Sequence, residues 1–282
     1  MVSTPLTRPF AFTPKDFDRL RGLVRRHTGI SLSELKQDMV YRRLSPRLKE
    51  LGLTSFAEYC QRLSESNGEE LEQFTNAITT NLTAFFREPH HFEYLANTAL
   101  PELIAKKGPS RRLRIWSAGC SSGEEAYSLA IVVKESLLDS ADWDVRILAT
   151  DIDSNMLSKA RQGIYSQERV QDLSHERLQR LFLKGRGSHR GMVKVVPQLR
   201  SLVHFKRLNL LHEWSMRGPF DIIFCRNVVI YFDQETKRAM FDRFAELMGD
   251  GNHLFVGHSE SLFRLSDHFH LVHKTIYRKV AG

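Results

Sequence analysis

The stretch Ala118-Gly119-Cys120-Ser121-Ser122-Gly123-Glu124-Glu125-Ala126 lies between two segments with regular apolar patterns. It follows the apolar run Leu113–Trp116 and leads into a helical pattern over Ala126–Leu138. A strand, a glycine-containing turn and a helix in this order form the phosphate- or nucleoside-binding edge of a doubly wound α/β sheet. The stretch therefore predicts an α/β fold with a ligand at this turn.

The charge of the turn argues against a phosphate ligand. It lacks the G-x-G-x-x-G spacing of dinucleotide-binding loops and the lysine of a P-loop. Glu124 and Glu125 stand where a phosphate would need bare amides. At a helix N-terminus they would help to cap the helix, but they would also repel a pyrophosphate. We therefore expect an uncharged or cationic nucleoside.

Length and composition predict a soluble cytoplasmic protein of one large and one smaller domain. The chain has 282 residues, of which 41% are hydrophobic and 26% charged. Met1–Pro14 lacks the apolar core of a signal peptide, and runs such as Ile222–Cys225 are too short to insert into a membrane. Cys60, Cys120 and Cys225 lack metal-type spacing and fit a reducing compartment.

The net charge of +8 is concentrated near the N-terminus. Between Arg19 and Lys49 there are nine lysines and arginines but only Glu34 and Asp38 as acids. We expect this region to meet an acidic partner.

The first hundred residues show helical patterns. Thr13-Pro14 is an N-cap and first-turn pair, and Gly29 suits the end of that helix. A second helix is expected after Ser31 or Ser33, interrupted at Pro46 with Ser45 as a new N-cap. Its expected apolar stripe is Leu35, Met39, Leu44, Leu48 and Leu51. The next expected helices are Thr54–Leu63, Gly68–Ile78 and a linker within Pro89–Pro101, followed by a polar hinge at Lys106–Arg112.

From Arg112 onward strands alternate with helices, which predicts a mostly parallel sheet. The expected strands are Leu113–Trp116, Val145–Ala149, Phe220–Cys225, His253–Gly257 and His270–Tyr277. Met192–Val196 and Ser201–Phe205 read as a β-hairpin, and hence as a small antiparallel subdomain at about 188–206.

Asp151 follows the second strand, where an acidic residue usually accepts ribose hydroxyls. The alternative is that Asp151 or Asp153 caps the next helix. Glycine turn and acid together favour a nucleoside cofactor.

Two further segments carry candidate functional side chains. Thr79–Glu88 interleaves polar residues with two phenylalanines, and Arg87 could clamp a carboxylate bidentately or instead pair with Glu88 or Glu93. After the strand Phe220–Cys225 we expect Arg226, Asn227 and Tyr231 to face the crevice. The alternative makes Tyr231 a core aromatic and Arg226 an ordinary surface charge.

Metal and hydrolytic mechanisms find no support in the sequence. His90 and His91 are adjacent, which should prevent both from facing one site on a helix. No G-x-S-x-G elbow is present.

Taken together and in order, these segments resemble the chemotaxis receptor methyltransferases of the CheR family over nearly the whole chain. The resemblance rests on the arginine-rich helical N-terminus, Asn81–Glu88, Ala118–Ser128, Ala149–Asp153, Asn209-Leu210-Leu211 and Phe224–Asp233. It implies a Rossmann-like S-adenosylmethionine methyltransferase sheet, here over 112–282, with an inserted antiparallel β-subdomain. A helical substrate-recognition domain over 1–88 and a linker over 89–111 would precede it.

The resemblance also implies the site. The cofactor contacts would be Asn81, Thr83, Arg87, Gly119, Glu124, Asp151, Asn209, Leu210, Arg226 and Asn227. Because S-adenosylmethionine carries a sulfonium and an ammonium group, an acidic turn around Glu124 then makes electrostatic sense. A glutamate substrate, with a pKa of about 4.3, is already ionised and needs no general base. Arg87 and Tyr231 would hold that carboxylate against the methyl group, and no metal is expected.

The implied partner is the acidic helical bundle of chemoreceptor cytoplasmic domains, at membrane receptor arrays. Arg43, Arg47 and Lys49 resemble the family's substrate-contacting helix, although Pro46 departs from an uninterrupted helix there. The β-subdomain docks a receptor C-terminal peptide in some members of the family. A regulatory partner protein would remain unidentified by sequence.

Two rival functions share some of these features. A nucleic-acid methyltransferase would combine this fold with basic charge, but it would usually carry an Asn/Asp-Pro-Pro-aromatic turn where this chain has Arg226-Asn227-Val228-Val229. A non-catalytic module that senses S-adenosylmethionine is disfavoured by the presence of both Arg87 and Tyr231.

Overall fold

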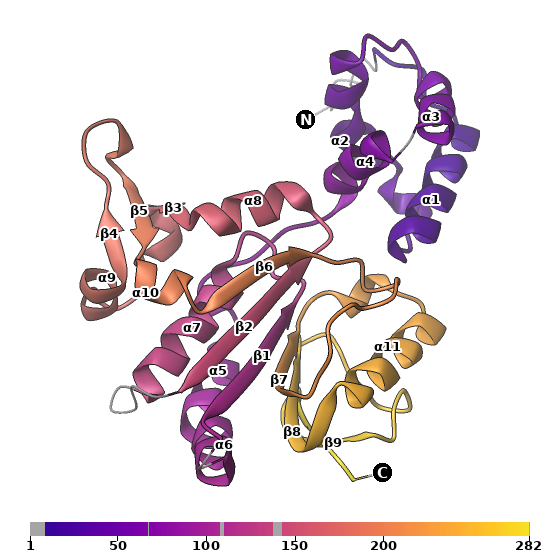
Figure 1. Cartoon of the computed structure of the whole chain (residues 1–282). Helices are drawn as coiled ribbons and strands as arrows, with labels where there is room; N and C mark the ends of the chain where they lie inside the picture. Colours follow the sequence, from indigo (N-terminus) through magenta and orange to yellow (C-terminus); the bar gives the residue numbers. More distant parts are fainter. Residues whose placement is uncertain (1–8, 67, 108–109, 138–142, 282) are drawn as a thin grey trace, which may run out of the picture. The chain divides into compact units, whose positions relative to one another are not determined.

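The computed structural model describes residues 9–66, 68–107, 110–137 and 143–281. The chain divides into two units, Met1–Thr80 and Asn81–Gly282 (Figure 1). Residues 81–88, which sequence analysis placed in the N-terminal domain, therefore belong to the second unit. The expected helix end at Leu138 and residues 108–109 of the expected hinge lie outside the described residues.

The first unit is helical and has its own apolar core. Its helices are α1 (Pro14–Thr28), η1 (Glu34–Lys36), α2 (Gln37–Glu50), α3 (Phe56–Glu65) and α4 (Glu69–Ile78). Thr13 and Asp16 form a capping box, in which each side chain accepts the other residue's N–H at 2.9–3.2 Å. Gly29 ends α1 in the left-handed region at φ 72°. Both predicted ends of this helix are confirmed.

Helix α2 differs from its prediction in two respects. It continues through Pro46, so Ser45 is not an N-cap; its hydroxyl donates to the carbonyl oxygen of Tyr41 at 2.7 Å. Pro46 lacks the N–H that would otherwise donate to the carbonyl oxygen of Arg42, a residue that is exposed to water. Leu35, which precedes α2, is 92% exposed and does not belong to the apolar stripe.

The second unit contains a seven-stranded sheet in the order β6-β2-β1-β7-β8-β10-β9. Its strands are β1 (Arg112–Ala118), β2 (Asp144–Asp151), β6 (Val203–Arg207), β7 (Phe220–Cys225), β8 (Met248–Val256), β9 (Phe269–His273) and β10 (Ile276–Lys279). The first five strands in the spatial order pair in parallel, and β10 and β9 add antiparallel. The mostly parallel sheet is confirmed, but the single strand expected at His270–Tyr277 is a hairpin.

The predicted hairpin is wrong. Met192–Val195 (β5) pairs with β3 (Ile164–Ser166) and β4 (Phe182–Lys184) in a separate three-stranded antiparallel sheet. Strand β6 instead joins the edge of the main sheet, parallel to β2. Between them Pro197 begins the short helix α10 (Pro197–Arg200) and does not form a hairpin turn. The antiparallel subdomain exists, but its strands span 164–195 and not 188–206.

Helices cover both faces of the main sheet (Figure 1). They are α5 (Pro89–Tyr94), the π-helix η2 (Leu95–Ala99), α6 (Leu100–Lys107), α7 (Glu124–Ser136), α8 (Ser154–Gln162) and α11 (Gln234–Glu246). Shorter helices of this unit are η3 (Gln167–Val170), α9 (His175–Leu181), η4 (Gly187–His189) and η5 (Val229–Tyr231), and α9 packs against β4 of the small sheet. Adjacent residues of β1 bury on opposite faces, Ile115 in the cluster under α5–α7 and Trp116 in the cluster under α11. Among the described residues, no helix has the length and apolarity needed to span a bilayer.

Candidate methyl-donor site

The glycine turn lies at the carboxyl end of β1, as predicted. Gly119 has φ +90°, and a Cβ added there would lie 2.3 Å from Cγ2 of Val228. The N–H groups of Gly119 and Cys120 donate to the carbonyl oxygen of Thr150 at 2.8 and 2.9 Å, which ties the turn to β2. Only glycine fits this conformation and this close approach.

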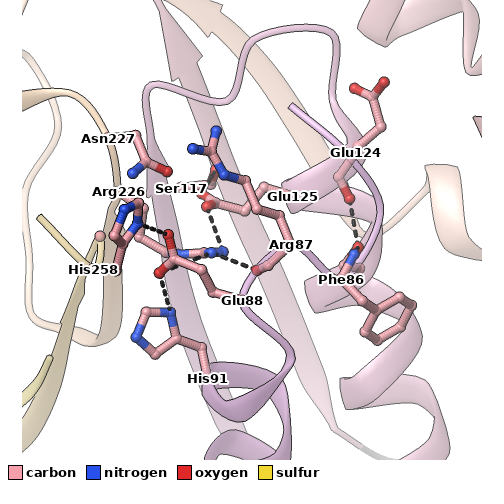
Figure 2. A network of polar contacts seen from close by, with 12 residues as sticks. Phe86, Arg87, Glu88, His91, Ser117, Glu124, Glu125, Arg226, Asn227 and His258 are labelled. Atoms are coloured by element: carbon pink, nitrogen blue, oxygen red, sulfur yellow. Dashed lines mark hydrogen bonds and ion pairs between the residues drawn. The ribbon is translucent and has the colours of Figure 1, made fainter. Parts of the chain in front are cut away.

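Glu124, at the start of α7, is fully buried. Its carboxylate accepts from the hydroxyl of Ser122 at 2.7 Å and forms an ion pair with Arg169. In Figure 2 this carboxylate points away from the Arg226–Glu88 network. Arg169 was not among the predicted residues. Its positive charge already balances part of the negative charge of Glu124, which the sequence assigned to a cationic ligand.

Glu125 faces a different set of partners. Its carboxylate accepts from Ser117 Oγ at 2.7 Å and lies 3.2 Å from Nη1 of Arg226. Burial raises the pKa of Glu125, although Arg226 opposes the shift. Sequence reasoning did not give this residue a role in the site. The reason that Glu125 needs a partner lies in α7 itself. Residues Glu124–Val133 of this helix are all buried, and a buried charge needs a partner.

Of the two acids that the sequence offered as caps of the next helix, Asp153 caps it. Asp153 is the N-cap of α8 and accepts the N–H groups of Asn155 and Met156 at 2.9 and 3.1 Å. Asp151 accepts the N–H groups of Ser121 and Asp153 at 2.7 and 2.9 Å, one on each oxygen. A carboxylate offers about four acceptor positions, so Asp151 can accept further hydroxyl donors. Burial raises its pKa to about 6.

The segment Asn81–Glu88 joins this cluster through its main chain and its amide. Asn81 Nδ2 donates to Asp153 at 2.7 Å, and the Asn81 carbonyl accepts from Ser121 Oγ at 3.4 Å. Arg87 donates to the carbonyl of Leu82 at 2.6 Å and, within the described part of the chain, forms no ion pair with Glu88 or Glu93. Thr83 is half-buried.

Arg226 has a buried side chain. Its side chain is 2% exposed; it pairs with Glu125 at 3.2 Å and Glu88 at 3.4 Å, and donates to the carbonyl oxygen of Arg87 (Figure 2). These three acceptors come from two segments that are distant in the sequence, which explains why the side chain turns inward, although its Nε is buried without a partner among the described residues. The expectation of an ordinary surface charge is therefore wrong, and Arg226 connects β7 to the main chain at Arg87.

Glu88 is the second centre of this network. It has φ 58°, and its carboxylate lies 3.0 Å from Nδ1 of His258 and 3.5 Å from Nδ1 of His91. Burial alone would raise the pKa of Glu88, but the charge of Arg226 together with the contacts to His258 and His91 outweighs burial and lowers the pKa. Burial, followed by Arg226, lowers the pKa of His91 to about 3, so this ring is neutral.

Glu88, His90 and His91 bring ligand-capable atoms within 4.8 Å of one another. The expectation that adjacent histidines cannot share a site is thus wrong here. His91 Nε2 lies 2.9 Å from the hydroxyl of Thr275, however, and Arg226 already provides a cation at Glu88. We assign the cluster to the ion network.

The remaining predicted cofactor residues lie on loops that follow strands. Asn209 Oδ1 accepts the N–H of Leu211 at 3.0 Å, and Leu210 is buried after β6. Asn227 has φ 58° directly after β7, and Tyr231 is half-buried against the apolar cluster under α11.

The three predicted substrate contacts lie on α2 in the first unit. Arg43 donates to the carbonyl oxygens of Ile78 and Thr79, the latter at 2.7 Å. Arg47 holds Glu70 bidentately at 2.6 and 3.0 Å, and Lys49 is exposed.

Comparison with known proteins gives one consistent family. The family models described as CheR methyltransferase, SAM binding domain, and CheR methyltransferase, all-alpha domain, match residues 81–278 and 15–79. Chemotaxis protein methyltransferase 2 of Pseudomonas aeruginosa is 46% identical over 269 residues, which cover 95% of this chain and 94% of that protein. The chemotaxis protein methyltransferases of Escherichia coli and Salmonella typhimurium are 43% and 42% identical, covering 96% and 98% of this chain and 93% and 94% of those proteins. The chain belongs to the CheR family of S-adenosylmethionine-dependent methyltransferases.

Proposed function

We propose that this protein transfers a methyl group from S-adenosylmethionine to glutamate side chains of chemoreceptor cytoplasmic domains. The products are glutamyl methyl esters and S-adenosylhomocysteine, and the process is sensory adaptation in bacterial chemotaxis. The observation that carries the proposal is the acidic glycine turn, in a chain whose relatives are named chemotaxis protein methyltransferases.

The residues of this turn fit the methyl donor. Gly119 brings no side chain to the turn, Asp151 has acceptor positions for ribose hydroxyls, and Glu124 supplies negative charge for an ammonium group. The ammonium group and Arg169 would then share the carboxylate of Glu124. The proposed contacts are Asn81, Thr83, Arg87, Gly119, Glu124, Asp151, Asn209, Leu210, Arg226 and Asn227. When bound, S-adenosylmethionine supplies a methyl group activated by a sulfonium.

The protein's own task is to position and desolvate the nucleophile. A glutamate carboxylate is ionised at neutral pH, so no proton has to be removed. Arg87 uses one donor on Leu82 and keeps others for a carboxylate, because a guanidinium has five. We propose that Arg87 and Tyr231 hold the substrate carboxylate.

We also propose that the basic first unit meets the acidic receptor bundle at membrane arrays. Arg43, Arg47 and Lys49 are the proposed contacts. Arg43 and Arg47 support the helices of this unit through their bonds to Ile78 and Glu70, whereas exposed Lys49 is available to a partner. The three-stranded sheet would take a receptor C-terminal peptide, and a regulatory protein would be a further partner.

Transfer of labelled methyl groups tests the function. The purified protein is offered receptor cytoplasmic fragments, RNA or DNA, and the label is then exposed to base. We expect label on the receptor fragment that base releases, because glutamyl methyl esters are base-labile. Base-stable label on nucleic acid alone, or donor binding without any transfer, contradicts the proposal. Arg87→Ala and Tyr231→Phe should both lose turnover, and Tyr231→Phe, which is not a proposed cofactor contact, should still bind S-adenosylhomocysteine. Full turnover in both variants contradicts their assignment.

A further inference from the structure

A buried carboxylate lies behind the loop that follows β7. Glu260 is 4% exposed, and within the described part of the chain it forms no ion pair. All its partners are main-chain N–H groups, those of Asn227 and Val228 at 2.9 Å, Ile230 at 3.3 Å and Gly257 at 2.6 Å. A buried carboxylate is tolerated only when hydrogen bonds replace its hydration, so these donors and Glu260 require one another.

The loop needs an acceptor from outside itself. Asn227 is in the left-handed region at φ 58°, and the chain then enters the single turn Val229–Tyr231. The first N–H groups of such a turn have no partner within it. Glu260 is the group that accepts them.

The turn from Gly257 to Glu260 lies so close to the loop after β7 that no side chain fits between them at Gly257. A Cβ added to Gly257 would lie 2.5 Å from Asn227 Nδ2, 2.8 Å from the Asn227 backbone nitrogen and 2.9 Å from Glu260 Oε2. Two neighbouring strand ends, those of β7 and β8, are therefore joined by one carboxylate.

The same loop supports the methyl-donor site on its other side. Val228 packs against Gly119, and Asn227 and Tyr231 are proposed contacts of donor and substrate. We propose that Glu260 is a positioning residue: by accepting the N–H groups of residues 227, 228 and 230, it fixes the loop against the glycine turn. This inference rests on the proposed function.

Glu260→Gln tests it, with Asp221→Asn as a matched control. In Glu260→Gln, an amide nitrogen replaces one carboxylate oxygen. This nitrogen is a donor, so it cannot accept the main-chain N–H groups that face it. Asp221 is equally buried, accepts the N–H of Arg114 at 2.8 Å and pairs with Lys107 at 2.6 Å, but it lies at the opposite end of β7. Each variant loses one buried carboxylate, and only the first touches the loop.

At a temperature where both variants are folded, we expect Glu260→Gln to bind S-adenosylhomocysteine at least tenfold more weakly and to lose at least tenfold in kcat. Asp221→Asn should lower Tm but keep both values within twofold of wild type. Values within twofold for folded Glu260→Gln, or an equal loss in Asp221→Asn, would overturn the proposal.

If Glu260→Gln does not fold, the variant Gly257→Ala decides, because its added Cβ displaces the loop without changing the charge. Unchanged binding and kcat in Gly257→Ala would also overturn the proposal. Product affinity needs no receptor, so failure of the wild type to methylate receptors would contradict the proposed function separately.

Discussion

Val228 occupies the space that a side chain on Gly119 would need, since an added Cβ would lie 2.3 Å from Val228 Cγ2. We expect Gly119→Ala to fold but to bind S-adenosylhomocysteine at least tenfold more weakly. The clash and the φ of +90° together force the turn to move, and a left-handed non-glycine residue alone costs about 1–3 kcal/mol. Isothermal titration calorimetry measures the affinity.

Gly52→Ala is the control for this prediction. Gly52 also has positive φ, at +67°, but apart from its chain neighbours no described residue comes within 4 Å of its Cβ position, and it belongs to the first unit. It should lose stability by about 1–2 kcal/mol without losing affinity. Equal affinities of the wild type, Gly119→Ala and Gly52→Ala for S-adenosylhomocysteine would show that Gly119 is not part of the site.

Arg226→Met should destabilise the second unit strongly. It leaves the buried carboxylates of Glu88 and Glu125 without their cation, and breaking a buried ion pair in this way costs about 3–5 kcal/mol. Urea denaturation followed by circular dichroism gives the free energy of unfolding. Arg180→Met is the control, because its pair with Glu176 is exposed and contributes at most about 1 kcal/mol. A loss of similar size in both variants would show that the Arg226 network adds little to stability.

Binding of S-adenosylhomocysteine should depend on pH through Asp151. Burial raises the pKa of this group from 3.8 to about 6. Between these values the folded protein holds a proton that the unfolded chain has lost, so this group's contribution to stability falls as the pH rises. A ribose hydroxyl needs the ionised acceptor, so affinity should change in the opposite direction, becoming about tenfold weaker at pH 5 than above pH 7.

The variant Asp151→Asn separates this effect from other titrations. It should bind S-adenosylhomocysteine weakly at every pH, and its affinity should no longer change near pH 6. Asp144→Asn, at the exposed start of the same strand, should keep the wild-type profile. An unchanged profile in Asp151→Asn would assign the step to another group.

Local signals predicted the parts of the fold that local chemistry determines. Thr13 and Gly29 mark the ends of α1, and the run before Ala118 marks β1 and the turn after it. The predicted hairpin was wrong because a short apolar run does not specify which strand it pairs with: β5 and β6 are both such short runs, but they pair in different sheets. Pro197 ends one strand in either arrangement, so its position could not decide between them.

The sequence predicted which residues lie near the site but not which contacts they form. Gly119, Asp151 and Asn81 do lie on adjoining segments. Arg226 follows a strand, where a charged residue normally faces solvent; its burial depends on Glu88 and Glu125, which come from distant parts of the chain. Arg169 and Glu260 lacked any motif, because their roles arise only when their segments meet in the folded protein.

Glu124 and Arg169 give the sharpest test of the acidic turn. If Glu124 binds the ammonium group of the donor, Glu124→Gln should weaken binding of S-adenosylhomocysteine by about tenfold or more, the usual scale of a charge-assisted hydrogen bond. Arg169→Met should behave differently, because it leaves the fully buried Glu124 without its ion pair. That variant should have a lower Tm alone and a larger rise in Tm on adding S-adenosylhomocysteine, since the ligand's ammonium replaces the missing cation. Differential scanning fluorimetry at fixed ligand concentration compares the rises. A smaller rise than in wild type, together with unchanged affinity in Glu124→Gln, would reduce Glu124 to a structural partner of Arg169 and Ser122.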